Sequence, residues 1–167
     1  MLRNVPGGVL CLLLVVLVAA VGCGRKTMVV PPQALVPVAV DDLEYSLTDK
    51  GVRLSWSFPQ KTVGGIRLKQ IDSFEIMRSA VPVEDYCEGC PQPFGPPVEI
   101  RGGILPDDGS GRKASFTDGP LHAGYHYTYK VRARAGKWGA SQDSNRVGFE
   151  WNPSGSPSSR PLEDHKP

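Results

Sequence analysis

The sequence predicts an all-β protein, a single antiparallel β-sandwich of seven strands. Short segments in which apolar and polar residues alternate recur along the chain, and a period of two is the pattern of a strand with one buried face. Glycine and proline are abundant, with 19 Gly and 16 Pro in 167 residues, which favours a loop-rich β domain over a helical one. The number and spacing of the segments fit a sandwich of two sheets.

The clearest alternation fills residues 52–58, where Val52, Leu54 and Trp56 alternate with polar residues and Pro59 ends the strand. In the first predicted strand, at residues 38–47, the alternation of apolar and polar residues shifts by one position at Asp41-Asp42, which predicts a bulge or a strand start after these residues. In chain order, we predict strands at residues 38–47, 52–58, 71–77, 98–100, 114–118, 125–134 and 146–151.

Residues 121–134 carry the most informative pattern. Leu121, Gly124 and Tyr127 follow one another at intervals of three, and alternating apolar positions continue to Ala133. This order resembles strand F of a fibronectin type III domain. The segment G-V-R-L-S-W-S-F-P resembles strand B of that family, and S-Q-D-S-N at residues 141–145 resembles its approach to strand G.

The resemblance covers residues 38–151 and implies a fibronectin type III or immunoglobulin-like sandwich. It implies that Trp56 and Leu121 belong to the core and that Tyr127 closes a tyrosine corner, with its hydroxyl bonded to upstream backbone. Such sandwiches host many unrelated functions, so the resemblance implies a fold but no ligand.

The N-terminus has the features of a secretion signal. Arg3 precedes an apolar run at residues 9–22, which is shorter than the ~20 residues that span a bilayer. The run ends in A-V-G-C, which resembles the lipobox of bacterial lipoproteins, in which the cysteine, here Cys23, is acylated and becomes the new N-terminus. The alternative is an ordinary signal cleaved near Gly22, with Cys23 left as a thiol.

The predicted organisation is therefore a helical lipoprotein signal peptide at 1–22, a Pro-rich tether at 23–37, the sandwich at 38–151 and a disordered Ser/Pro-rich tail at 152–167. The resemblance of residues 20–23 to a lipobox implies a lipid anchor in the cell membrane or the outer membrane, with the domain facing the periplasm or the cell exterior.

Cys87 and Cys90 form the one chemical motif inside the predicted domain. A thioredoxin-like pair requires a helix after the first cysteine, and the prolines that follow Cys90 exclude one. Haem attachment requires a histidine at position 91, which is Pro91. A disulfide that shapes the long insertion at 79–97 is the prediction, and a zinc ion bridging two copies is the alternative.

Three basic residues, Lys130, Arg132 and Arg134, share the outward face of the strand at 125–134. They predict either a surface for an acidic ligand or a solvated face paired with Glu75. In the loop that follows, Lys137 and Trp138 predict a contact surface, with a Trp138 folded over the core as the alternative.

The formal charge of +2 gives no reason to expect nucleic acid as a partner. No Ser-His-Asp order, paired carboxylates or phosphate-binding loop is discernible, and we expect no cofactor, no metal and no catalysis. The sequence thus predicts a membrane-anchored binding or spacer module with a protein or glycan partner, working through the loops at 79–97 and 135–143. A thiol-active or metal-bridged periplasmic protein that uses Cys87 and Cys90 is the alternative.

Overall fold

The computed structural model describes residues 32–153, except for the side chains of Pro32 and Trp138. The predicted signal peptide, Cys23 and nearly all of the predicted tail lie outside these residues. Within them, no helix combines the length and apolar character that a membrane crossing requires.

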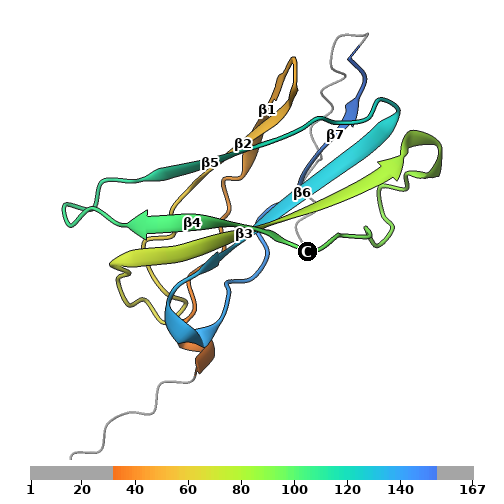
Figure 1. The fold of residues 1–167 in the computed structure, drawn as a ribbon. Coiled ribbons are helices and arrows are strands. Elements are labelled where there is room, and N and C mark those ends of the chain that lie inside the picture. The colour runs from red at the N-terminus through yellow and green to blue at the C-terminus, as the bar shows by residue number, and fades with distance from the viewer. Residues whose placement is uncertain (1–31, 154–167) are drawn as a thin grey trace, which may run out of the picture. The chain divides into compact units, whose positions relative to one another are not determined.

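Seven antiparallel strands form two sheets, which confirms the predicted fold class (Figure 1). One sheet has the order β1-β2-β5 and the other has the order β4-β3-β6-β7, a fibronectin type III-like arrangement. The strands are β1 (Glu44–Thr48), β2 (Gly51–Ser57), β3 (Gln70–Pro82), β4 (Val98–Ile104), β5 (Lys113–Asp118), β6 (Tyr125–Arg134) and β7 (Val147–Trp151). The 3-10 turn η1 (Pro32–Leu35) precedes β1, and two more, η2 (Val83–Asp85) and η3 (Gly136–Trp138), lie in connections between strands.

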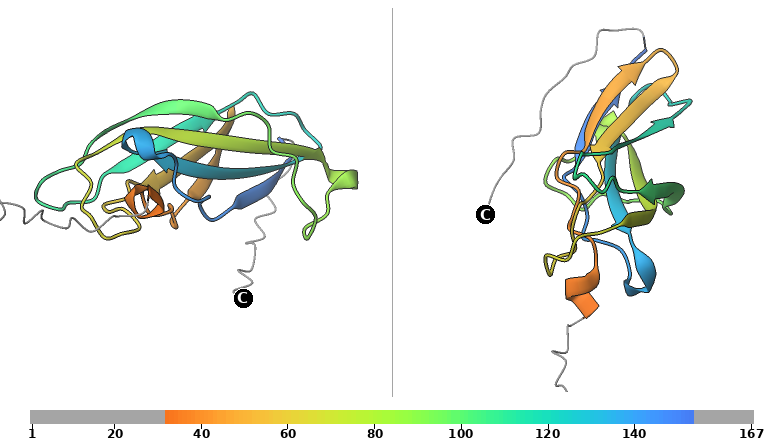
Figure 2. Two further views of the ribbon diagram at one scale, coloured as in Figure 1. Left: turned by 90° about the horizontal axis from the view of Figure 1, so that it is seen from below. Right: turned by 90° about the vertical axis from the view of Figure 1, so that its left-hand side faces the viewer.

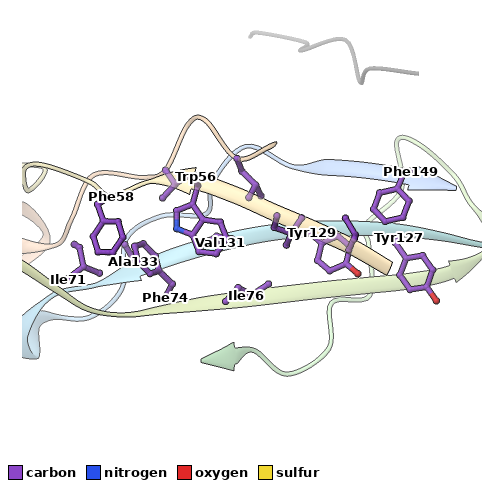
Figure 3. Packing of buried hydrophobic residues seen from close by; sticks show 14 of the residues in the cluster. Trp56, Phe58, Ile71, Phe74, Ile76, Tyr127, Tyr129, Val131, Ala133 and Phe149 are labelled. Carbon is purple, nitrogen blue, oxygen red and sulfur yellow. The ribbon is translucent and has the colours of Figure 1, made fainter. Parts of the chain in front are cut away.

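The core lies between the two sheets and is rich in aromatic side chains (Figure 3). Trp56 of β2 is fully buried and meets Phe74 of β3 edge to face, with 5.3 Å between ring centroids. Phe58 packs on the same ring at 4.9 Å. Because each sheet contributes alternate residues to this layer, the period of two in the sequence becomes the inner face of each strand.

The domain starts earlier than the sequence predicts. Residues 32–37, predicted as tether, lie against the loop between β2 and β3: the Gly64 N–H donates to the Ala34 carbonyl at 2.8 Å, and the Val63 N–H donates to the Val36 carbonyl at 2.9 Å. Conversely, β1 begins only at Glu44, after the slip in alternation. The segment before it contributes Val40 and other side chains to the core without pairing as a strand.

β3 is longer than predicted and ends at Pro82, where it pairs with Tyr125 of β6. β4 likewise extends to Ile104. Along β3 the buried face changes: Phe74 points into the core, whereas further on Ser79 of the outer face is buried and Ala80 of the inner face is exposed. The alternation that predicts strands thus reverses here, because a loop covers the outer face. Two further views show η1 at one end of this domain and η2 at the other (Figure 2).

Candidate functional site

Residues 83–97 connect β3 to β4 and are called the disulfide loop below. Cys87 and Cys90 are bonded to each other, as predicted, with an S–S distance of 2.06 Å. The Gln92 side chain donates to the backbone carbonyls of both cysteines, at 3.1 Å and 3.2 Å. The loop therefore has a fixed tip, closed once by a covalent bond and again by an amide side chain.

The disulfide loop folds back over the outer face of β6. Tyr86 stacks on His126, with 3.5 Å between ring centroids and an interplanar angle of 14°. Phe94 lies beneath the ammonium of Lys130, 4.1 Å from nitrogen to ring centroid. The Gly95 N–H donates to the Arg78 carbonyl at 2.9 Å, which ties the end of the loop to β3.

This packing corrects the prediction of a solvated outer face on β6. His126, Thr128 and Lys130 are all buried, and the first half of β6 is enclosed on both faces. The sequence could not reveal it, because the covering rings of Tyr86 and Phe94 belong to a segment without periodic pattern.

The predicted basic stripe is neutralised within the domain. Lys130 and Arg132 both donate to the carboxylate of Asp143, and Arg134 donates to Glu75, the partner that the sequence indicated. Burial by itself raises the pKa of Asp143. The hydrogen bonds that it accepts from Lys130 and Arg132, together with their charges, lower the pKa by more than burial raises it, so the net shift is downward. These cations hold carboxylates of their own chain, which leaves little free charge for an acidic ligand.

His126 is enclosed without a hydrogen bond. Neither of its ring nitrogens has a partner among the described residues, and Nε2 lies so close to Gly148 that a Cβ there would be only 2.9 Å away. Burial lowers the pKa of His126, although Glu150 and Glu88 act in the opposite direction. The neutral ring is therefore the form that this site favours.

The other side chains of the disulfide loop point to solvent. Glu84, Asp85 and Glu88 are exposed, and the loop contains no lysine or arginine. The result is an acidic surface on a braced loop. Lys137 is exposed in η3, while the side chain of Trp138 lies outside the described part of the chain.

The predicted core residues lie as follows. Trp56 is fully buried, and Leu121 is half-buried at the margin of the core. The hydroxyl of Tyr127 accepts a hydrogen bond from the backbone N–H of His122 at 2.8 Å, which is the geometry of a tyrosine corner. Next to it, the hydroxyl of Tyr129 donates to Asp118 of the opposite sheet at 2.8 Å.

The S-Q-D-S-N segment has a role that its sequence did not indicate. The hydroxyls of Ser144 and Ser141 accept hydrogen bonds from the N–H groups of Val131 and Ala133, in place of carbonyls of a regular strand. Asn145 then clamps the backbone of Leu43, accepting from its N–H and donating to its carbonyl, each at 2.9 Å. This segment joins the last strand of one sheet to the approach of the first strand of the other.

Within residues 32–153, no three histidine, cysteine or acidic side chains gather as a metal site would require. A hollow of about 250 Å³ lies between residues 38–42 and 57–60. There, the carboxylate of Asp42 is already engaged by the backbone N–H of Ser57. The disulfide loop is therefore the feature of the described surface with the most distinctive chemistry.

No family model matches the chain, and no curated protein matches it. Among solved structures, it resembles the twitchin kinase region of C. elegans at 17% identity with a TM-score of 0.46, covering 69% of this chain and 16% of that one. It resembles the third fibronectin III domain of the human KIAA0343 protein at 18% identity and TM-score 0.45, covering 83% and 100%. A structure described as a myokine is 17% identical with a TM-score of 0.40, covering 68% and 96%.

Proposed function

We propose that this chain is a lipid-anchored protein of the bacterial cell envelope that binds another protein through its disulfide loop and catalyses no reaction. The observation that carries the binding role is the combination of a braced backbone and exposed charge in that loop. The disulfide, the Tyr86–His126 stack and the Phe94–Lys130 contact hold the loop, while its acidic side chains remain in solvent.

A braced loop suits recognition because little conformational entropy is lost when it binds. Its carboxylates favour a partner surface that presents lysine or arginine, since complementary charge raises the rate of encounter and opposes wrong partners. The same charge opposes an anionic glycan, so a protein partner fits this loop better. Because the two cysteines are bonded to each other, this state offers neither a nucleophilic thiol nor a thiolate metal ligand.

The anchoring role rests on the lipobox-like A-V-G-C at residues 20–23 and on the position of η1, where the described residues begin, at one end of the domain (Figure 2). Metabolic labelling with a palmitate analogue tests it. We expect the wild-type protein to be labelled and a Cys23→Ala variant to be unlabelled and to accumulate with its signal attached. Equal labelling of both proteins would refute the anchor.

The binding role is tested in living cells with a photo-crosslinking residue at Glu88, and with a control at Asp49, an exposed position in the β1–β2 turn. We expect one discrete adduct from position 88 and none from position 49. A crosslinker at position 91, an exposed position next to Cys90, should give the same adduct, and combined Glu84→Lys, Asp85→Lys and Glu88→Lys replacement should remove it if charge selects the partner. A domain that gives no adduct from either loop position is a spacer instead.

A further inference from the structure

A second surface lies at the other end of β3, in the loop before it. Residues 61–69, called the basic hairpin below, pair Lys61 with Arg67. The turn is closed by the Thr62 N–H donating to the Ile66 carbonyl at 2.8 Å and by the Ile66 N–H donating to the Thr62 hydroxyl at 3.2 Å. Gly65 adopts a φ of 81°, which suits glycine at the tip.

The tip of the basic hairpin presents aliphatic side chains to solvent. Val63 is 59% exposed and Ile66 is 50% exposed, although the turn that holds them is well hydrogen-bonded. Ile104, at the end of β4 beside the base of the hairpin, is 73% exposed. These are three of the five exposed large hydrophobics in the described chain; of the other two, Val83 begins the disulfide loop and Val98 follows it. Single exposed aliphatics are ordinary, whereas a group at one end indicates a contact.

Basic residues surround this aliphatic tip. Lys61, Arg67 and Lys69 are exposed, and the hairpin has no acidic residue. Lys61 and Lys69 form no ion pair within residues 32–153, and Arg67 donates to the backbone carbonyls of Pro106 and Asp107. The adjoining loop at 105–112 carries Asp107 and Asp108. Hydrogen bonds from Ser110 lower the pKa of Asp108, and the charge of Arg67 lowers it further.

The two ends of β3 therefore differ in charge: the basic hairpin precedes Gln70, and the acidic disulfide loop follows Pro82. Thirteen extended residues separate the ends by roughly 40 Å. A charge separation of this kind orients a molecule above an anionic surface, with the basic end towards it.

The basic hairpin also lies beside the point where the chain enters the domain. The Gly64 N–H donates to the carbonyl of Ala34 in η1, so the tip of the hairpin and η1 lie side by side (Figures 1 and 2). Between Cys23 and Pro32 lie only residues 24–31, and eight residues span at most ~30 Å in any conformation. A lipid on Cys23 would keep this end of the domain near the bilayer.

We infer that the tip of the basic hairpin, with Val63 and Ile66, docks on the anionic surface of the lipid bilayer and directs the disulfide loop away from the membrane. This inference rests on the proposed anchor. The aliphatic side chains enter the headgroup region, as in other interfacial segments, while Lys61, Arg67 and Lys69 contact lipid phosphates. An attraction of ~1 kcal/mol per basic residue at a charged surface corresponds to about fivefold in the docking equilibrium for each one.

The test uses the full-length processed protein, purified from membranes and reconstituted in vesicles of phosphatidylcholine alone or with about 30 mol% of the anionic lipid phosphatidylglycerol. An environment-sensitive fluorophore is attached at Val63→Cys, at Ile66→Cys as a second position, and at Asp49→Cys as the control in the β1–β2 turn. We expect a blue-shifted, brighter emission at positions 63 and 66 in the anionic vesicles and an unchanged emission at position 49.

Combined Lys61→Gln, Arg67→Gln and Lys69→Gln replacement should weaken docking by roughly 100-fold and abolish the shift. The matched control carries Lys50→Gln, Arg53→Gln and Arg101→Gln. These residues are also exposed and lie outside the basic hairpin, so this variant should retain the shift. Protein that floats with anionic vesicles but gives the same emission at positions 63, 66 and 49 overturns the docking alone. Protein that does not float with any vesicle overturns the anchor, and the docking with it.

Discussion

Tyr86 and His126 stack nearly parallel, and this pair joins the disulfide loop to the longest strand pairing of the domain. The ring of His126 is buried on the outer face of β6, where the sequence predicts a solvated side chain. Opening the loop would return both rings to water, so the stack couples the position of the disulfide loop to the protonation of one histidine.

The first prediction concerns pH. Burial lowers the pKa of His126 in the folded protein, while the unfolded value is about 6.5. Below that value the unfolded chain binds a proton that the folded chain resists, so the stability is fully present above about pH 6.5 and falls as the pH drops towards the lower, folded pKa. Glu150 and Glu88, the charged groups that face the ring, reduce the effect without reversing it.

Urea unfolding at several pH values between 7.5 and 5 measures this. The midpoint of a His126→Phe variant should decline less than that of the wild type over this range. His122→Gln, at an exposed histidine, serves as the control and should keep the wild-type slope. Parallel slopes in all three proteins would mean that His126 is not the group responsible.

The second prediction concerns the tyrosine corner. Tyr127→Phe removes the acceptor of the His122 N–H and should lower the free energy of unfolding by about 1–2 kcal/mol, because the N–H then loses its partner in a partly buried turn. Tyr125→Phe on the same strand is the control, since the Tyr125 hydroxyl takes no part in the tyrosine corner, and this change should cost less than about 0.5 kcal/mol. Chemical denaturation of both variants decides between them.

The third prediction concerns Asp143, which holds two cations. Asp143→Asn should destabilise the protein by roughly 1–3 kcal/mol, because Lys130 is buried and loses its counter-ion. Glu75→Gln, which releases only the half-exposed Arg134, should cost about 1 kcal/mol or less. The ranking of the two variants in urea unfolding is the measurement, and a larger loss from Glu75→Gln would contradict the assignment.

The fourth prediction concerns the clamp between the sheets. Asn145→Ala removes both hydrogen bonds to Leu43 and should cost about 1–2 kcal/mol, even though the side chain lies near the surface. Gln142→Ala, an exposed neighbour in the same segment, should be close to neutral. Hydrogen exchange at the Leu43 amide adds a local readout, and it should accelerate in the Asn145 variant alone.

The amino-acid pattern by itself determined the fold class, because each of the seven alternating segments has one apolar face, and packing two sheets together buries these faces. Trp56 could be placed in the core from its neighbours Leu54 and Phe58, since the local alternation indicates which face of a strand is buried. The Cys87–Cys90 bond followed equally from local sequence, because only three residues of separation and the surrounding prolines are involved.

Only the tertiary structure decided what covers the outer face of β6 and which ends of the domain carry charge. The contacts of His126 with Tyr86 and of Lys130 with Phe94 join residues that are about forty positions apart, and no period relates them. The same holds for Asn145 and Leu43, which are separated by 102 positions. The local pattern indicates which face of a segment is buried, whereas the packing between distant segments depends on the fold of the whole domain.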